Sequence, residues 1–122
     1  MRSAAGGFHL VTDAMAAAGH EDGRYTLGAR IVDVHQGVAT LDGSQTLAGS
    51  TLTMDAAIRG AVAAGQSLLT SVQAATMLPA VHLSLRDVGQ LVPGYRADLV
   101  VLDDTLIARR TMRSGRWLDV PV

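Results

Sequence analysis

The sequence has no cysteine and few aromatic residues, with one tryptophan, two tyrosines and one phenylalanine among 122 residues. The absence of cysteine excludes a disulfide scaffold, a thiolate zinc site and a cysteine nucleophile. No apolar run approaches the roughly 18 residues of a membrane span, and the first residues lack the apolar core of a signal peptide. The sequence therefore predicts a soluble, cytoplasmic protein that has no membrane partner.

Charge is also sparse. Charged residues make up 17% of the chain, the formal net charge is −1, and lysine is absent. The densest basic group, Arg109, Arg110, Arg113 and Arg116, is small, which argues against nucleic acid as a partner. We expect it to be a solvated face of the C-terminal strands. The hydrophobic content of 48% indicates a folded globular chain with the length of one ordinary domain.

The first apolar segment, Phe8–Thr12, reads as a short buried strand that is followed at once by Asp13. Only seven residues precede this strand, and a strand needs a partner to be stable. We therefore expect the chain to be part of a larger fold.

A loop of small residues over 14–23 comes next. Alternating apolar and polar residues over 24–41 then predict an antiparallel β-meander, with turns at Gly28, Gln36-Gly37 and Asp42-Gly43.

From Thr53 the apolar period becomes helical. Thr53 is a plausible N-cap with Asp55 in the first turn, and Gly65 is expected to end this helix. Ser67 is expected to cap a second helix, and Pro79 to begin a short helical turn.

The tail is richer in strands. The pattern predicts strands over 97–102, 106–108, 111–113 and 116–118, the last two joined by a turn at Ser114-Gly115. A strand, a meander, helices and then short strands do not close into one layered domain. This order is typical of the end of an α/β barrel with an accessory sheet still attached.

Asp13 is the first candidate for chemistry. It ends an apolar strand and precedes a flexible loop, which is where the catalytic groups of α/β barrels project. A carboxylate there can take a proton from a metal-bound water and return it to a leaving group. The alternative is that Asp13 only caps the following turn.

The segment Leu47–Met54 is the second candidate, because its small residues let a ligand approach the backbone and a helix start offers free N–H groups. Local chemistry alone favours an ordinary loop-to-helix cap.

The four histidines do not form a compact metal motif, since no two of them lie three to five residues apart. His9 and Asp13 would share one face of a strand about 13 Å apart, too far to bind one metal. We expect His9 to be packed or hydrogen-bonded inside a barrel and His20, His35 and His82 to lie at the surface. There is also no serine-nucleophile motif and no phosphate-binding glycine loop.

Three blocks resemble the N-acetylglucosamine-6-phosphate deacetylases, a family of metal-dependent amidohydrolases. They are LVTDAMAAAG at Leu10–Gly19, DGRYTLG at Asp22–Gly28 and LAGSTLTM at Leu47–Met54. The tail PGYRADLVVLD at Pro93–Asp103 resembles the amidohydrolase ending in general. The resemblance covers nearly the whole chain.

The resemblance implies an α/β fold, the C-terminal part of a TIM-like (β/α)8 amidohydrolase barrel plus the C-terminal half of a small β-sandwich. Residues 1–84 would end the barrel, with strand eight at 8–13, an inserted meander at 24–41 and terminal helices at 53–84. Residues 85–122 would be the sandwich strands.

It also implies site roles. Asp13 matches the aspartate that activates the hydrolytic water and protonates the departing amine, and Leu47, Ala48 and Gly49 match the loop that contacts the sugar phosphate substrate. The divalent metal, zinc or similar, would be held by a glutamate and two histidines from earlier strands, so no ligand is expected in this chain. The full-length family members are usually homodimers.

Two residues depart from the family pattern, since His82 and Ser84 stand where arginine and glycine are usual after Pro79-Ala80. Without metal ligands, the chain by itself is predicted to be inactive and to fold poorly. Two other interpretations stay open: a non-catalytic β-rich interaction module, and an amidohydrolase acting on another N-acyl sugar or cyclic amide.

Overall fold

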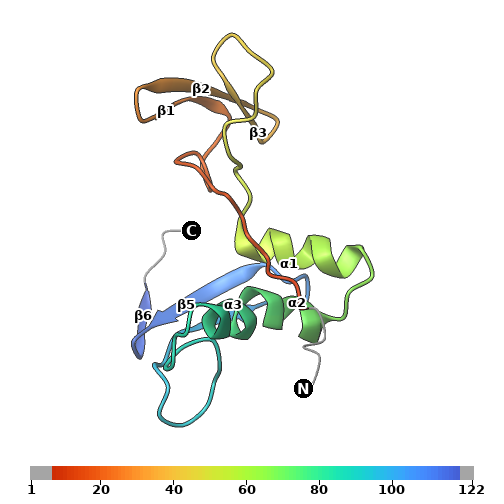
Figure 1. Cartoon of the computed structure of the whole chain (residues 1–122), viewed down its shortest axis with the longest axis vertical. Coiled ribbons are helices and arrows are strands. Elements are labelled where there is room, and N and C mark those ends of the chain that lie inside the picture. The colour runs from red at the N-terminus through yellow and green to blue at the C-terminus, as the bar shows by residue number, and fades with distance from the viewer. Residues whose placement is uncertain (1–6, 119–122) are drawn as a thin grey trace. The chain divides into compact units, whose positions relative to one another are not determined.

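The computed structural model describes residues 7–118, and the chain divides into two compact units, each treated by itself below (Figure 1). We call Val11–Ala57 the meander unit. The helical unit consists of the described parts of 1–10 and 58–122. Strands and helices together give an α/β fold, as expected. No helix within 7–118 combines the length and apolar character needed to cross a bilayer, and the longest, α1, has 10 residues.

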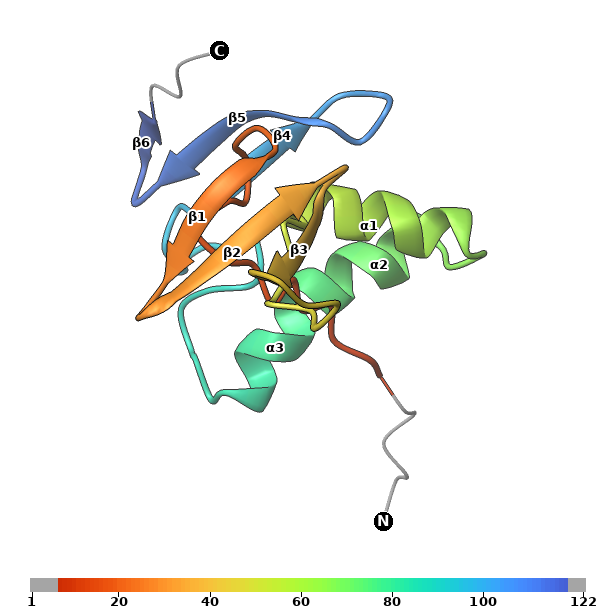
Figure 2. The ribbon, with the colours of Figure 1, turned by 90° about the horizontal axis from the view of Figure 1, so that it is seen from above.

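The meander unit contains three antiparallel strands in the order β1-β2-β3, which lie side by side in Figure 2. They are β1 (Gly23–Leu27), β2 (Arg30–His35) and β3 (Val38–Leu41). The predicted meander and its turns are therefore confirmed. Gln36 and Gly37 both have positive φ, 50° and 75°, which suits a two-residue hairpin turn.

Alternation along β2 builds the core of this unit. Val32 and Val34 are buried on one face while Asp33 between them points to the other face. Three small residues, Ala17, Ala39 and Ala48, complete the buried cluster. This core holds few large side chains, so it contributes only modest hydrophobic stabilisation.

The strand predicted at 8–12 is not formed. These residues have no strand pairing within the described chain, and pairing nearby is limited to one parallel bridge between Ala14 and Ser50. The prediction of a short buried strand was therefore wrong for this chain, in which Phe8 and Val11 are exposed. A strand needs a neighbour that supplies hydrogen bonds along its length.

The predicted helices are present as α1 (Met54–Ala63), α2 (Leu68–Ala75) and α3 (Met77–His82). Thr53 precedes α1, and its carbonyl accepts the first helical bond from the N–H of Ala57. The Ser67 hydroxyl caps α2 by accepting a bond from the N–H of Thr70, at 3.0 Å. Gly65 ends α1 with a φ of 94°. Pro79 does not begin α3 but lies in its first turn, where its missing N–H still costs nothing.

The C-terminal sheet has the antiparallel order β4-β5-β6, formed by β4 (Leu99–Leu102), β5 (Ala108–Arg113) and β6 (Arg116–Leu118). The Ser114-Gly115 turn is confirmed. One prediction was wrong, because the two short strands expected at 106–108 and 111–113 are a single strand. Arg109 and Arg110 do not interrupt β5, since exposed strand positions accept long polar side chains.

Candidate functional site

Asp13 is exposed to solvent and adopts a left-handed backbone conformation with a φ of 50°. Aspartate is one of the few residues other than glycine that visit this region often. The carboxylate is therefore carried by a left-handed residue in the segment Thr12–Met15, which we call the Asp13 turn.

Ser50 holds this turn through its backbone and its side chain. Its N–H donates to the carbonyl of Asp13 at 2.8 Å, and its carbonyl accepts from the N–H of Met15 at 2.8 Å. The Ser50 hydroxyl donates to the carbonyl of Thr12 and accepts from the N–H of Leu52. Bonds on both sides of Asp13 fix the backbone that carries the carboxylate.

Gly49 lies directly against the Asp13 turn. A Cβ added to Gly49 would lie 3.1 Å from the Asp13 carbonyl oxygen and 3.4 Å from Cβ of Met15, and its φ is 84°. Glycine is required here by close approach and by backbone conformation together. The segment at 47–50, which we call the Ser50 loop, and Asp13 are thus brought together, although 33 or more residues separate them in the sequence.

The other two residues predicted to contact substrate differ in what they can offer. Leu47 is 70% exposed, so its side chain is available to a ligand. Ala48 is buried in the core of the meander unit, and its N–H already donates to the carbonyl of Ala39 at 3.0 Å. The side chain and the N–H of Ala48 are therefore both engaged within the meander unit. From the sequence alone these two positions looked equivalent.

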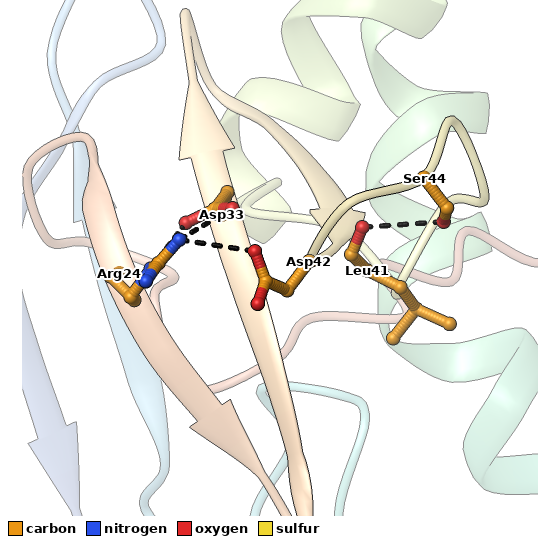
Figure 3. Close-up of polar contacts among 5 residues, drawn as sticks. All are labelled: Arg24, Asp33, Leu41, Asp42 and Ser44. Carbon is orange, nitrogen blue, oxygen red and sulfur yellow. Dashed lines mark hydrogen bonds and ion pairs between the residues drawn. The ribbon is translucent and has the colours of Figure 1, made fainter.

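An ion network that sequence reasoning missed lies on the meander (Figure 3). The Arg24 guanidinium donates to the carboxylates of Asp33, at 2.9 Å, and Asp42, at 3.0 Å. The hydrogen bond from Arg24 is the main reason that the pKa of Asp33 is lowered, and the same bond raises the pKa of Arg24. Arg24 and Asp33 are direct cross-strand partners, so the correct register would have been the signal for the pair.

A shallow hollow of about 300 Å³ adjoins this network, lined by Asp33, Thr40, Leu41, Gly43, Ser44 and Gln45. Its charged lining residue, Asp33, is already paired with Arg24. The hollow does not include Asp13 or the Ser50 loop. We interpret the network as a structural connection between strands, which contributes little free energy because exposed ion pairs are well solvated.

The described residues do not form a catalytic metal centre. Within 7–118, no group of three or more histidine, cysteine, aspartate or glutamate side chains is placed to hold an ion. Asp13 therefore has no metal site of its own in this part of the chain. His9 and His82 are both exposed, and their rings contact each other. His82 at the surface was expected, whereas His9 lies in a contact that the sequence did not predict.

The Amidohydrolase family model matches residues 8–118. The chain is 44% identical over 111 residues to rat N-acetylglucosamine-6-phosphate deacetylase, covering 89% of this chain and 27% of that protein. It is 43% identical over 109 residues to a putative N-acetylgalactosamine-6-phosphate deacetylase of Escherichia coli K12, covering 88% of this chain and 65% of that protein.

Solved structures similar to this chain are deacetylases as well. One is an N-acetyl-D-glucosamine-6-phosphate deacetylase mutant from Mycobacterium smegmatis in complex with N-acetyl-D-glucosamine-6-phosphate, with a TM-score of 0.82, 46% identity and coverage of 89% of this chain and 30% of that one. Another is the Thermotoga maritima deacetylase, with a TM-score of 0.79, 39% identity and coverage of 90% and 30%. The chain thus spans less than a third of the length of these structures. Because the family match extends over almost all of its residues, the chain belongs to the amidohydrolase family.

Proposed function

We propose that this chain is the C-terminal segment of a metal-dependent deacetylase that hydrolyses N-acetylglucosamine 6-phosphate to glucosamine 6-phosphate and acetate. The names of the similar proteins support this substrate. The observation that carries the proposal is the contact between the Asp13 turn and the Ser50 loop, because it joins two of the three sequence blocks that resemble this enzyme.

The proposed architecture assigns 1–84 to the end of a (β/α)8 barrel and 85–122 to strands of a small β-sandwich. Residues 8–13 would be the eighth barrel strand, with the meander inserted after it and α1 to α3 ending the barrel. The absence of strand pairing at 8–12 within the described residues supports this assignment, since an apolar segment of this kind can become a strand once neighbouring strands supply hydrogen bonds. The complete enzyme would be a homodimer.

In the proposed reaction, Asp13 acts as general base and then general acid. Its carboxylate takes a proton from the water whose oxygen bonds to the acetyl carbon. The same proton then passes to the sugar nitrogen as the C–N bond breaks, releasing acetate and the free amine. Ser50 fixes the backbone of Asp13, so little reorganisation is needed to keep the carboxylate in position.

The Ser50 loop is the proposed contact with the sugar phosphate. Leu47 offers an exposed apolar side chain, Ala48 offers its carbonyl group, and Gly49 lets the ligand approach the backbone.

By itself the chain should be inactive. General acid–base catalysis contributes roughly 10² to 10⁴ in rate, whereas enzymes accelerate their reactions by about 10⁶ or more. The missing part must come from groups outside the described residues, including those that hold the divalent metal, zinc or similar, that the family implies.

The test is a chimera in which the preceding part of the Mycobacterium smegmatis deacetylase is fused in front of Met1. We expect the chimera to release acetate from N-acetylglucosamine 6-phosphate. Asp13→Asn should lower kcat by about 10² or more, because it removes the general base while keeping the side-chain shape. Asp104→Asn, at an exposed position outside the proposed site, is the matched control and should leave kcat unchanged. Full turnover by the Asp13→Asn chimera would refute the assignment.

A second candidate substrate is N-acetylgalactosamine 6-phosphate, because a relative from Escherichia coli O157:H7 with 43% identity is an N-acetylgalactosamine-6-phosphate deacetylase. The two sugars differ in the orientation of one hydroxyl group. The same chimera separates them by the ratio of kcat/KM for the two substrates. A ratio that favours the galactose form would replace the first candidate with the second.

A further inference from the structure

His9, in the N-terminal segment of the helical unit, and His82, in the last turn of α3, meet as a pair. Their ring centroids are 5.1 Å apart and the ring planes are inclined by 64°, an edge-to-face contact. Both residues are exposed, so the pair is open to solvent ions. Neither histidine belongs to the site proposed for deacetylation. The sequence did not predict this pair, because its two members lie far apart along the chain.

Contacts on either side of His9 attach its segment to α2 and α3. A Cβ on Gly7 would lie 3.1 Å from a methyl group of Leu78, so Gly7 packs on α3 one turn before His82. The N–H of Leu10 donates to the carbonyl of Ala74 at 3.0 Å. The segment at 7–10 is therefore fixed to α2 and α3 on both sides of His9.

The separation of the rings suits a shared metal ion. A zinc–nitrogen bond of about 2.0–2.1 Å places the metal about 3.2 Å from the centre of an imidazole ring. Two imidazoles bound at a tetrahedral angle then have ring centres roughly 5.2 Å apart. The observed separation of 5.1 Å is close to this value.

We propose that His9 and His82 bind one divalent transition-metal ion such as Zn²⁺, Ni²⁺ or Cu²⁺. Imidazole nitrogen suits these ions, whereas Mg²⁺ and Ca²⁺ require oxygen ligands. Within 7–118 no third histidine, cysteine or carboxylate joins the pair, so water completes the coordination shell. Binding should follow the usual order for nitrogen ligands, with Cu²⁺ tighter than Ni²⁺ or Zn²⁺.

Titration calorimetry of the 122-residue chain with each metal chloride tests the site. We expect one ion to bind per chain. His9→Asn and His82→Asn should each weaken binding by about tenfold or more, since even residues that only support a metal ligand change affinity by 10- to 100-fold. The double variant His20→Asn/His35→Asn is the matched control and should bind as the unchanged chain does.

Imidazole signals in NMR spectra give a second measurement that does not depend on variants. Added Zn²⁺ should shift the signals of His9 and His82 together at one equivalent and leave those of His20 and His35 in place. Absence of binding, binding that survives both single substitutions, or shifts confined to His20 and His35 would each overturn the proposal.

Discussion

At the scale of single residues, Ser84 has a backbone conformation that usually requires glycine. Its φ is 58°, and it follows the last turn of α3. The N–H of Leu85 donates to the carbonyl of Ala80 at 2.9 Å, and the N–H of Ser84 donates to that of Val81 at 3.0 Å. These two bonds define a Schellman motif in which Ser84 is the left-handed residue.

Helix α1 ends with the same motif but carries glycine. The N–H of Gln66 donates to the carbonyl of Ala61 at 3.0 Å, and the N–H of Gly65 donates to that of Val62 at 2.9 Å. An added Cβ at Gly65 would meet nothing within 4 Å. The same left-handed position of the Schellman motif is therefore occupied by serine after α3 and by glycine after α1, so the two residue types can be compared within one chain.

We predict that Ser84→Gly stabilises the chain and Gly65→Ser destabilises it. The left-handed conformation costs a side-chain-bearing residue roughly 1–2 kcal/mol, and the greater unfolded-state freedom of glycine offsets about 0.4–1 kcal/mol of that. A change of about 1 kcal/mol in the free energy of unfolding, opposite in sign for the two variants, should follow. Urea unfolding monitored by helical circular dichroism at equal, low protein concentration measures both. A loss of stability in Ser84→Gly would contradict the argument.

Asp103 shows how one carboxylate organises the loop between β4 and β5. The N–H of Ile107, the hydroxyl and N–H of Thr105 and the Arg109 guanidinium all donate to it. The Ile107 N–H is the largest of the causes that hold the pKa of Asp103 far below its ordinary value. A hydrogen-bonded carboxylate of this kind stabilises the folded state in its charged form.

The sign of the pH dependence follows from this lowered pKa. The contribution of Asp103 is fully present above the unfolded pKa of about 3.9 and is lost as the pH falls from there towards the folded value. Asp103→Asn should therefore lower the urea midpoint at pH 7 and pH 5 by similar amounts and by less at pH 3. Asp104→Asn, next in sequence and exposed, should show no such pattern. An Asp103→Asn deficit that grows on acidification would disprove this role.

At the scale of elements, the sequence predicted correctly those helices and hairpins that depend on contacts between residues close in the chain. The meander follows from alternation and two-residue turns, and the helices follow from caps at Ser67 and Gly65, so all of these are found where expected. The strand expected at 8–12 is absent, and the two strands expected at 106–108 and 111–113 are the single strand β5. Both predictions were wrong because strand pairing depends on which neighbours supply hydrogen bonds.

The candidate site shows the same limit. The resemblance singled out Asp13 and the loop at 47–49, and the structure brings the two together. The sequence could not show that Ser50 is the residue that connects them, or that the Ala48 side chain is turned into the core. Both facts depend on contacts between residues far apart in the chain. The His9–His82 contact was missed for the same reason.

At the scale of the whole molecule, each unit buries little apolar surface. Among the described residues of the helical unit, the buried apolar side chains are Ile58, Ala74 and Ala80. Large apolar side chains on α2 and α3 remain open, including Leu69 at 67% and Val81 at 64% exposure. Burial of apolar surface is the dominant favourable contribution to folding. The exposed apolar side chains therefore do not contribute to the stability of the isolated chain.

We predict that the purified chain associates with itself at micromolar concentration, because exposed apolar patches are covered by other copies when nothing else covers them. Light scattering coupled to size exclusion should show a mass that rises with concentration, and the dye ANS should bind. The double variant Leu69→Gln/Val81→Gln should reduce both signals without loss of helical circular dichroism, since both side chains are mostly in solvent. Asp104→Asn is the matched surface control. A monomer at all concentrations that binds no dye and unfolds in one cooperative transition would show instead that these small cores suffice, and that the open faces of α2 and α3 do not drive association.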